Sequence, residues 1–244
     1  MGEELGKELG TSFRWKETLA APNGSLYGIP HYARRAVKFN PIDKSMTEIG
    51  PDFVGRDKWY RGAITDSDII YCPSSYSNHR GILKIDTNTD TVTVLDVDLL
   101  PEKGFLQWAS CAAALDGCIY FMPYDARRIM KLDPSNNDAT SSAGDDLISS
   151  YGYSIKYSGT VVGIDGCVYG IPYNSKRILK YDPINDITSF VGKEAYNDFV
   201  SRRNGALGRD GSICALATRG RVLKLIQSII PIALSGTLSG RHMV

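Results

Sequence analysis

The sequence lacks the features by which most catalytic, metal-binding and membrane-spanning chains are recognised. Its 244 residues include three histidines and five cysteines, with no C-x-x-C pair and no Cys/His cluster of the kind that zinc needs. No G-x-S-x-G elbow, phosphate-binding loop or H-E-x-x-H motif occurs. The net charge of +1 favours no nucleic acid, and the longest apolar stretch, residues 225–234, is too short to span a bilayer. We therefore predict no catalytic residue, metal, cofactor, nucleic-acid partner or transmembrane segment.

Disulfide pairing is also poorly supported, because the number of cysteines is odd. The apolar surroundings of the five cysteines predict buried free thiols, which are typical of a reducing compartment. No secretory signal opens the chain, and its first ten residues are acidic and glycine-rich. We expect an intracellular protein, in the cytoplasm or an organelle interior, with a flexible leader over residues 1–13.

One sequence phrase is repeated along the chain. Its clearest copy, residues 165–183, reads D-G-C-V-Y-G-I-P-Y-N-S-K-R-I-L-K-Y-D-P. The central tyrosine position returns every 44 to 49 residues, at Tyr27, Tyr71, Tyr120, Tyr169 and, as cysteine, Cys214. A period of this length is typical of one blade of a β-propeller.

Each unit predicts four short strands, A to D. Small residues nine positions before the tyrosine place strand A at the crowded propeller axis. Asn-Gly or Asp-Gly predicts a type I′ hairpin turn between A and B, and Asp-Pro or Asn-Pro ends strand C. Strand D is the exposed edge. We predict an all-β fold, a five-bladed β-propeller of four-stranded antiparallel blades over residues 14–234, with a degenerate last blade and a C-terminal tail at 235–244.

Aromatic residues stand twelve positions before the tyrosine in four units. Packing between adjacent blades is one interpretation and a ligand cage is the other. The four residues are Trp15, Trp59, Trp108 and Tyr157.

The repeat resembles a propeller repeat found in uncharacterised proteins of microbial eukaryotes, and it is more distantly similar to kelch, NHL and streptogramin-lyase propellers. The resemblance covers roughly residues 15–225 and implies the fold. It implies little about activity, because propellers serve as lectins, lyases, hydrolases and scaffolds. The kelch double glycine and the WD dipeptide are absent.

Antiparallel topology places the B–C and D–A loops together on one face, which we call the loop face. The A–B and C–D turns form the opposite turn face. Binding residues gather on long loops carried by a rigid frame, so the loop face is the predicted working face. Its B–C loops carry pairs of basic residues. The inner members, Arg35, Arg128 and Arg177, are expected to brace blades through acids such as Asp52 or Asp146, while the repeated strand-C lysines are expected to reach solvent.

The outer basic residues and the loop tyrosines are the candidate ligand or partner contacts. The full predicted site comprises His31, Tyr32, Arg34, His79, Arg80, Tyr124, Arg127, Tyr173 and Lys176. Arginine forks suit a small anionic ligand, tyrosines suit glycan stacking, and a His31–His79 pair suits a metal or acid–base chemistry. Three functions follow: a non-enzymatic scaffold mediating protein–protein interaction, such as an accessory subunit of a larger assembly; a lyase or hydrolase with its site at the channel mouth; or a glycan-binding lectin.

Overall fold

The computed structural model describes residues 14–74, 81–97, 107–147, 156–192, 202–217 and 222–225. These residues form strands and turns, without an α-helix and with one turn of 3-10 helix at Pro134–Asn136. The strands are β1 (Trp15–Ala20), β2 (Leu26–Pro30), β3 (Ala36–Phe39), β4 (Met46–Ile49), β5 (Ala63–Ile64), β6 (Ile69–Cys72), β7 (Ile82–Asp86), β8 (Thr91–Leu95), β9 (Trp108–Ala113), β10 (Ile119–Pro123), β11 (Ile129–Asp133), β12 (Ala139–Ala143), β13 (Tyr157–Val162), β14 (Val168–Pro172), β15 (Ile178–Asp182), β16 (Ile187–Val191), β17 (Arg202–Leu207), β18 (Ile213–Ala217) and β19 (Val222–Leu225).

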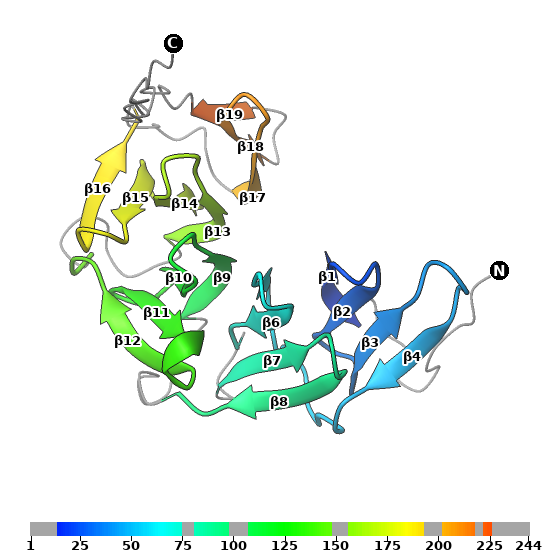
Figure 1. Ribbon diagram of the computed structural model, residues 1–244. Helices are drawn as coiled ribbons and strands as arrows, with labels where there is room; N and C mark the ends of the chain where they lie inside the picture. The colour runs from blue at the N-terminus through cyan, green and yellow to red at the C-terminus, as the bar shows by residue number, and fades with distance from the viewer. Residues whose placement is uncertain are drawn as a thin grey trace, which may run out of the picture.

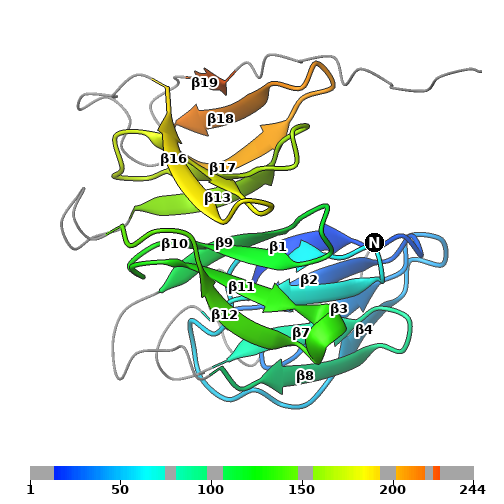
Figure 2. The ribbon, with the colours of Figure 1, turned by 60° about the vertical axis from the view of Figure 1, so that its left-hand side comes forward.

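Consecutive strands pair into antiparallel sheets that follow one another around an arc (Figure 1). Sheets 1 to 4 contain β1–β4, β5–β8, β9–β12 and β13–β16, and sheet 5 contains β17–β19 among the described residues. The first strand of each sheet lies on the inner side of the arc, and the fourth strands of sheets 1 to 4 lie at the outer margin (Figures 1 and 2). The predicted propeller of four-stranded antiparallel blades is confirmed.

Sheets 1 and 5 form the two ends of the arc and lie apart from one another (Figure 1). The blade count of the complete propeller therefore stays a prediction. The same holds for the boundaries of 14–234, because the leader at 1–13 and the tail at 235–244 lie outside the described residues.

The A–B turns differ from the predicted type I′ geometry. In sheet 1, Gly24 takes a φ of +83° while Asn23 does not enter the left-handed region. The amide of Gly24 donates to the carbonyl of Ala21 (2.9 Å), and the amide of Ala21 donates to Ser25 (2.9 Å). This pattern is a type I turn followed by a glycine bulge. The Asn23 side chain accepts from the Ser25 amide (2.9 Å), so the asparagine acts through its side chain instead of through a positive φ.

Packing between neighbouring sheets is the role of the repeated aromatics. Trp59 and Tyr27 are fully buried, and Tyr71 and Tyr157 are 1% exposed. The small residue of strand A is required by the same packing in sheet 5, because a Cβ on Gly205 would lie 2.9 Å from Ile171 and 3.0 Å from Val161 of sheet 4. The structure therefore confirms that the buried aromatics pack between blades and that strand A is crowded by its neighbours.

The strand-C lysines do not simply extend into solvent, which corrects the prediction. Lys38 donates to Asp90 of the next sheet (2.7 Å), and the hydroxyl of Tyr27 donates to the same carboxylate (2.7 Å). Lys84 and Tyr71 share Asp138 of sheet 3 in the same way, at 2.5 and 2.6 Å. These acids stand at left-handed positions of the C–D turns, with φ of +58° and +57°. The turn face therefore carries a hydrogen-bonded connection from one sheet to the next.

Candidate binding face

The B–C loops are held by single backbone carbonyls that precede strand A. The carbonyl of Arg14 accepts from the amides of His31 (2.9 Å), Tyr32 (3.1 Å) and Ala33 (2.8 Å). In sheet 3, the Gln107 carbonyl accepts from three consecutive amides, those of Tyr124, Asp125 and Ala126 (2.8–3.2 Å). In sheet 4, the Lys156 carbonyl accepts from Tyr173 (2.8 Å) and Ser175 (3.4 Å). Each loop tyrosine is therefore presented on a backbone that the fold has already ordered.

Sequence reasoning missed these carbonyl acceptors, which order the B–C loops. The contact uses only the main chain, so the residue type is free to vary between Arg14, Gln107 and Lys156. The constant spacing from the recurring tyrosine, thirteen residues, was the available signal.

His31 is buried, at 4% exposure, between sheets 1 and 2. Its Nδ1 lies 3.1 Å from the Trp59 carbonyl, and its Nε2 lies 3.2 Å from Asp57, which also accepts from the hydroxyl of Tyr32 (2.9 Å). Burial, followed by the charge of Lys16, lowers the pKa of His31. Both ring nitrogens thus face oxygens of the protein, which leaves this imidazole no unengaged nitrogen to offer a substrate.

The predicted partner of His31 cannot be placed, since His79 and Arg80 lie outside the described residues. A shared metal or acid–base pair there stays a prediction. Within the described ranges, no three His, Cys, Asp or Glu side chains lie close enough together to hold a metal ion.

The outer arginines form the ion pairs that were expected of the inner ones. Arg34 contacts Asp52 through Nε (2.6 Å) and Nη2, and Arg127 contacts Asp146 through Nε (3.1 Å) and Nη2. The hydrogen bond from Arg34 lowers the pKa of Asp52. The inner Arg128 instead donates to the Gly144 carbonyl (2.8 Å) within its own sheet. The reason is steric, because Arg34 and Arg127 lie one residue closer to the tip of the B–C loop than Arg35 and Arg128.

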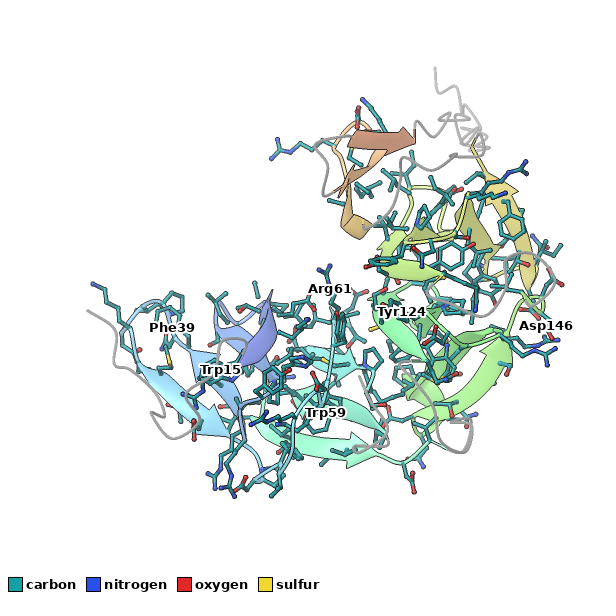
Figure 3. The ribbon with its side chains drawn as sticks, turned by 180° about the vertical axis from the view of Figure 1, so that it is seen from behind. Trp15, Phe39, Trp59, Arg61, Tyr124 and Asp146 are labelled. Atoms are coloured by element: carbon teal, nitrogen blue, oxygen red, sulfur yellow. The ribbon has the colours of Figure 1, made fainter. Side chains whose placement is uncertain are left out.

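The loop tyrosines divide into two groups. Tyr124 and Tyr173 of sheets 3 and 4 are half-buried neighbours, with ring centroids 6.1 Å apart and planes inclined at 49°. Tyr32 lies against His31 instead, with centroids 4.9 Å apart. Tyr124 lies on the inner side of the arc, whereas Asp146 lies at its outer margin (Figure 3). The loop face therefore extends from an aromatic inner region to a rim of paired charges, and exposed Lys176 belongs to its sheet 4 loop.

Two buried lysines beneath this face were also missed. The ammonium of Lys58 is fully buried and donates to the Gly55 carbonyl (2.9 Å), and burial lowers its pKa to about 8. Lys156, 5% exposed, donates to the Asp125 carbonyl (3.3 Å), and burial lowers its pKa as well. Each of these lysines lies just before strand A and donates its hydrogen bond to a loop carbonyl.

No protein-family model matches the sequence, and a search of the curated proteins gives no match. Among solved structures, the chain is similar to virginiamycin B lyase from Staphylococcus aureus, with 13% identity and a TM-score of 0.66 over 88% of this chain and 71% of that one. A streptogramin B lyase structure has 14% identity and a TM-score of 0.65, over 85% of this chain and 66% of that one. The extracellular domain assigned to a hybrid two-component system of B. thetaiotaomicron has 16% identity and a TM-score of 0.63, over 94% of this chain and 29% of that one. At these identities the likeness shows the β-propeller fold alone.

Proposed function

We propose that this propeller is a non-enzymatic binding protein, a scaffold or accessory subunit whose loop face holds a protein partner. The observation that carries the proposal is the ordered presentation of the loop tyrosines by the Arg14, Gln107 and Lys156 carbonyls. A surface ordered before binding loses little conformational entropy on association. Tyrosine and arginine are also the residues that most often dominate the energy of protein interfaces.

The engagement of His31 supports a binding role over an enzymatic one. A general base needs a nitrogen within reach of the proton that it removes. His31 is buried, and its nitrogens face Trp59 and Asp57.

Free thiols support the proposed reducing, intracellular compartment, since all five cysteines are unpaired and four are buried. No helix in the described part of the chain is long and apolar enough to cross a membrane.

A photo-crosslinking residue at Tyr124 tests the proposal in the full chain expressed in its native cells. We expect one covalent adduct with a protein partner. The matched control is the same residue at Leu115, which is 81% exposed on the turn face. An adduct at Leu115 alone, or none at either position, contradicts the proposal.

A triple variant, Arg34→Ala, Arg127→Ala and Lys176→Ala, then tests the charged part of the face. We expect less adduct at position 124 and a melting temperature that stays close to wild type, because exposed ion pairs contribute about 1 kcal/mol or less each. Full adduct formation by the triple variant would confine binding to the aromatic region.

A lyase is the second candidate, favoured by the fold neighbours, two of which are streptogramin-type lyases. Quinupristin, present in a structure of inactive virginiamycin B lyase, is a suitable probe. We expect no new product by chromatography. A product that disappears in His31→Ala would establish the enzyme.

Binding on a glycan array that is lost in Tyr124→Ala/Tyr173→Ala would instead establish the lectin alternative.

A further inference from the structure

A pocket of about 230 Å³ opens on the turn face where sheet 1 meets sheet 2. It lies between strands β3 and β4 and the turn that joins β7 to β8, which lies beside them (Figure 1). The lining residues are Lys38, Asn40, Ser45, Thr47 and Ile49 of sheet 1 and Asp90 of sheet 2. The pocket is mostly polar and smaller than the about 300–1,000 Å³ of a site for a drug-sized ligand. It therefore suits a small polar molecule.

The two charged residues of the pocket neutralise one another. Lys38 donates to both oxygens of Asp90, at 3.0 and 2.7 Å, and the buried hydroxyl of Tyr27 donates to Oδ1 (2.7 Å). The hydrogen bond to Asp90 raises the pKa of Lys38, so the ammonium stays charged at neutral pH. A carboxylate accepts about four hydrogen bonds, and these contacts use three of them. Oδ2 of Asp90 can therefore accept one more hydrogen bond, from a ligand, without any break in the ion pair.

The remaining lining is uncharged, which distinguishes this turn from its equivalents. Asn40 ends strand C of sheet 1, and its Oδ1 accepts from the amide two residues later (3.0 Å). The other four-stranded sheets have an aspartate at this position: Asp86, Asp133 and Asp182. The asparagine keeps the turn hydrogen bond that Asp182 also makes, without the negative charge. A neutral pocket that donates and accepts hydrogen bonds favours a ligand that does both, and hydroxyl groups have this property.

The equivalent region of sheet 2 is less accessible. Lys84 pairs with Asp138 of the next sheet as Lys38 pairs with Asp90. The side chain of Asp138 is only 14% exposed, whereas that of Asp90 is 34% exposed. Among the described sheets, sheet 1 alone combines an accessible carboxylate of the next sheet with an uncharged end of strand C. The pocket is therefore a property of this pair of sheets and not of the repeat.

We propose that this pocket binds a neutral polyhydroxyl compound of the size of a single sugar ring. One ligand hydroxyl donates to Oδ2 of Asp90, and the hydroxyl of Thr47 and the carboxamide of Asn40 hydrogen-bond to its neighbours. Ile49 provides the apolar wall for the carbon skeleton of the ligand. The site goes beyond the proposed partner-binding function, does not depend on it, and lies on the face opposite to the loop tyrosines.

An NMR titration of the isotope-labelled full chain tests the site with five compounds: glucose, galactose, mannose, myo-inositol and glycerol. We expect saturable binding of at least one of them, with shifted amide signals in β3, β4 and the β7–β8 turn. Cyclohexanol, a ring with a single hydroxyl, should not bind. Tyr124→Ala/Tyr173→Ala should bind like wild type, because those residues lie on the opposite face.

Substitutions at Thr47, which is exposed on β4, test the pocket itself. Thr47→Val should weaken binding about 3- to 10-fold through the loss of one hydrogen bond. Thr47→Trp should abolish binding because the larger side chain fills the pocket. Thr93→Trp is the matched control and should bind like wild type, since Thr93 lies opposite Lys84 in sheet 2 as Thr47 lies opposite Lys38. All three variants should melt close to the wild-type temperature, because both positions are exposed.

Four results would overturn the proposal. They are no binding of any of the five compounds, shifts confined to the loop face, equal affinity of wild type and Thr47→Trp, and the same loss in Thr93→Trp as in Thr47→Trp. If Thr47→Trp does not fold, Thr47→Val decides, and an affinity equal to wild type overturns the proposal. Crosslinking at Tyr124 is read independently, so either proposal can fail alone.

Discussion

Sheets 1 and 3 carry the same repeat, yet their aromatic residues have different environments. Trp15 and Trp108 each donate an indole N–H to the carbonyl of the arginine just before strand C, Arg35 (3.2 Å) and Arg128 (3.1 Å). Trp108 is 6% exposed because sheet 2 packs beside it, whereas Trp15, at the end of the arc, is only half-buried. The repeat determines the local bond, and the neighbouring sheet determines the burial.

The largest expected difference concerns these two tryptophans. Trp108→Ala should lower the free energy of unfolding by about 3–5 kcal/mol, because it leaves a cavity between sheets. Trp15→Ala should cost about 1–2 kcal/mol, since less apolar area returns to water. Urea denaturation of both variants measures the difference. If both variants lose the same free energy of unfolding, Trp15 is as deeply buried in solution as Trp108.

A second comparison sets Asp138 against Asp165. Tyr71 and Lys84 use Asp138 of the next sheet, whereas Tyr169 and Lys180 of sheet 4 use Asp165 of their own A–B turn, at 2.8 and 2.9 Å. Asp138 is 14% exposed and Asp165 is 33% exposed. Asp138→Asn should therefore destabilise the fold by about 2–3 kcal/mol and Asp165→Asn by about 1 kcal/mol.

Chemical denaturation at pH 7 tests this pair. Asparagine tolerates the left-handed backbone of Asp138, so the change reports the lost charge instead of turn strain. A larger loss for Asp165→Asn would mean that connections between sheets contribute less than contacts within one sheet.

The third comparison concerns pH and the buried Lys58, with an expected effect of about 1–2 kcal/mol. Its pKa is about 8 in the folded protein, below the value of about 10.4 of an unfolded lysine. The folded state binds fewer protons between these values, so raising the pH from 8 to about 10 should stabilise wild type relative to Lys58→Met.

Unfolding curves of wild type and Lys58→Met across that pH range provide the measurement. Lys156→Met is the matched variant from the equivalent position of sheet 4. Wild type should also gain stability relative to Lys156→Met as the pH rises, since burial lowers the pKa of Lys156 too. A difference that stays constant with pH would show that Lys58 titrates normally in the fold.

Much of the site could be predicted from the sequence, because the repeat fixes where each loop lies relative to its strands. Tyr124 and Tyr173, which were predicted to share one face, have neighbouring rings. The pairing of Arg34 with Asp52 was assigned to the wrong arginine, because a one-residue step on a loop changes which side chain reaches the acid. The carbonyl of Gln107 could not be found from residue type, since a backbone contact leaves residue identity unconstrained.

The sequence by itself determined the blade: its strand order and its glycine-bearing turns, which are set by contacts within one repeat, and the positions at which an aromatic recurs. Only the tertiary structure decided which acid receives Lys38, whether Trp15 is covered, and that the Nη1 of Arg61 is buried without an acceptor among the described residues. These depend on the neighbouring sheet, whose distance in the chain is a full repeat, and no local pattern encodes how two sheets meet.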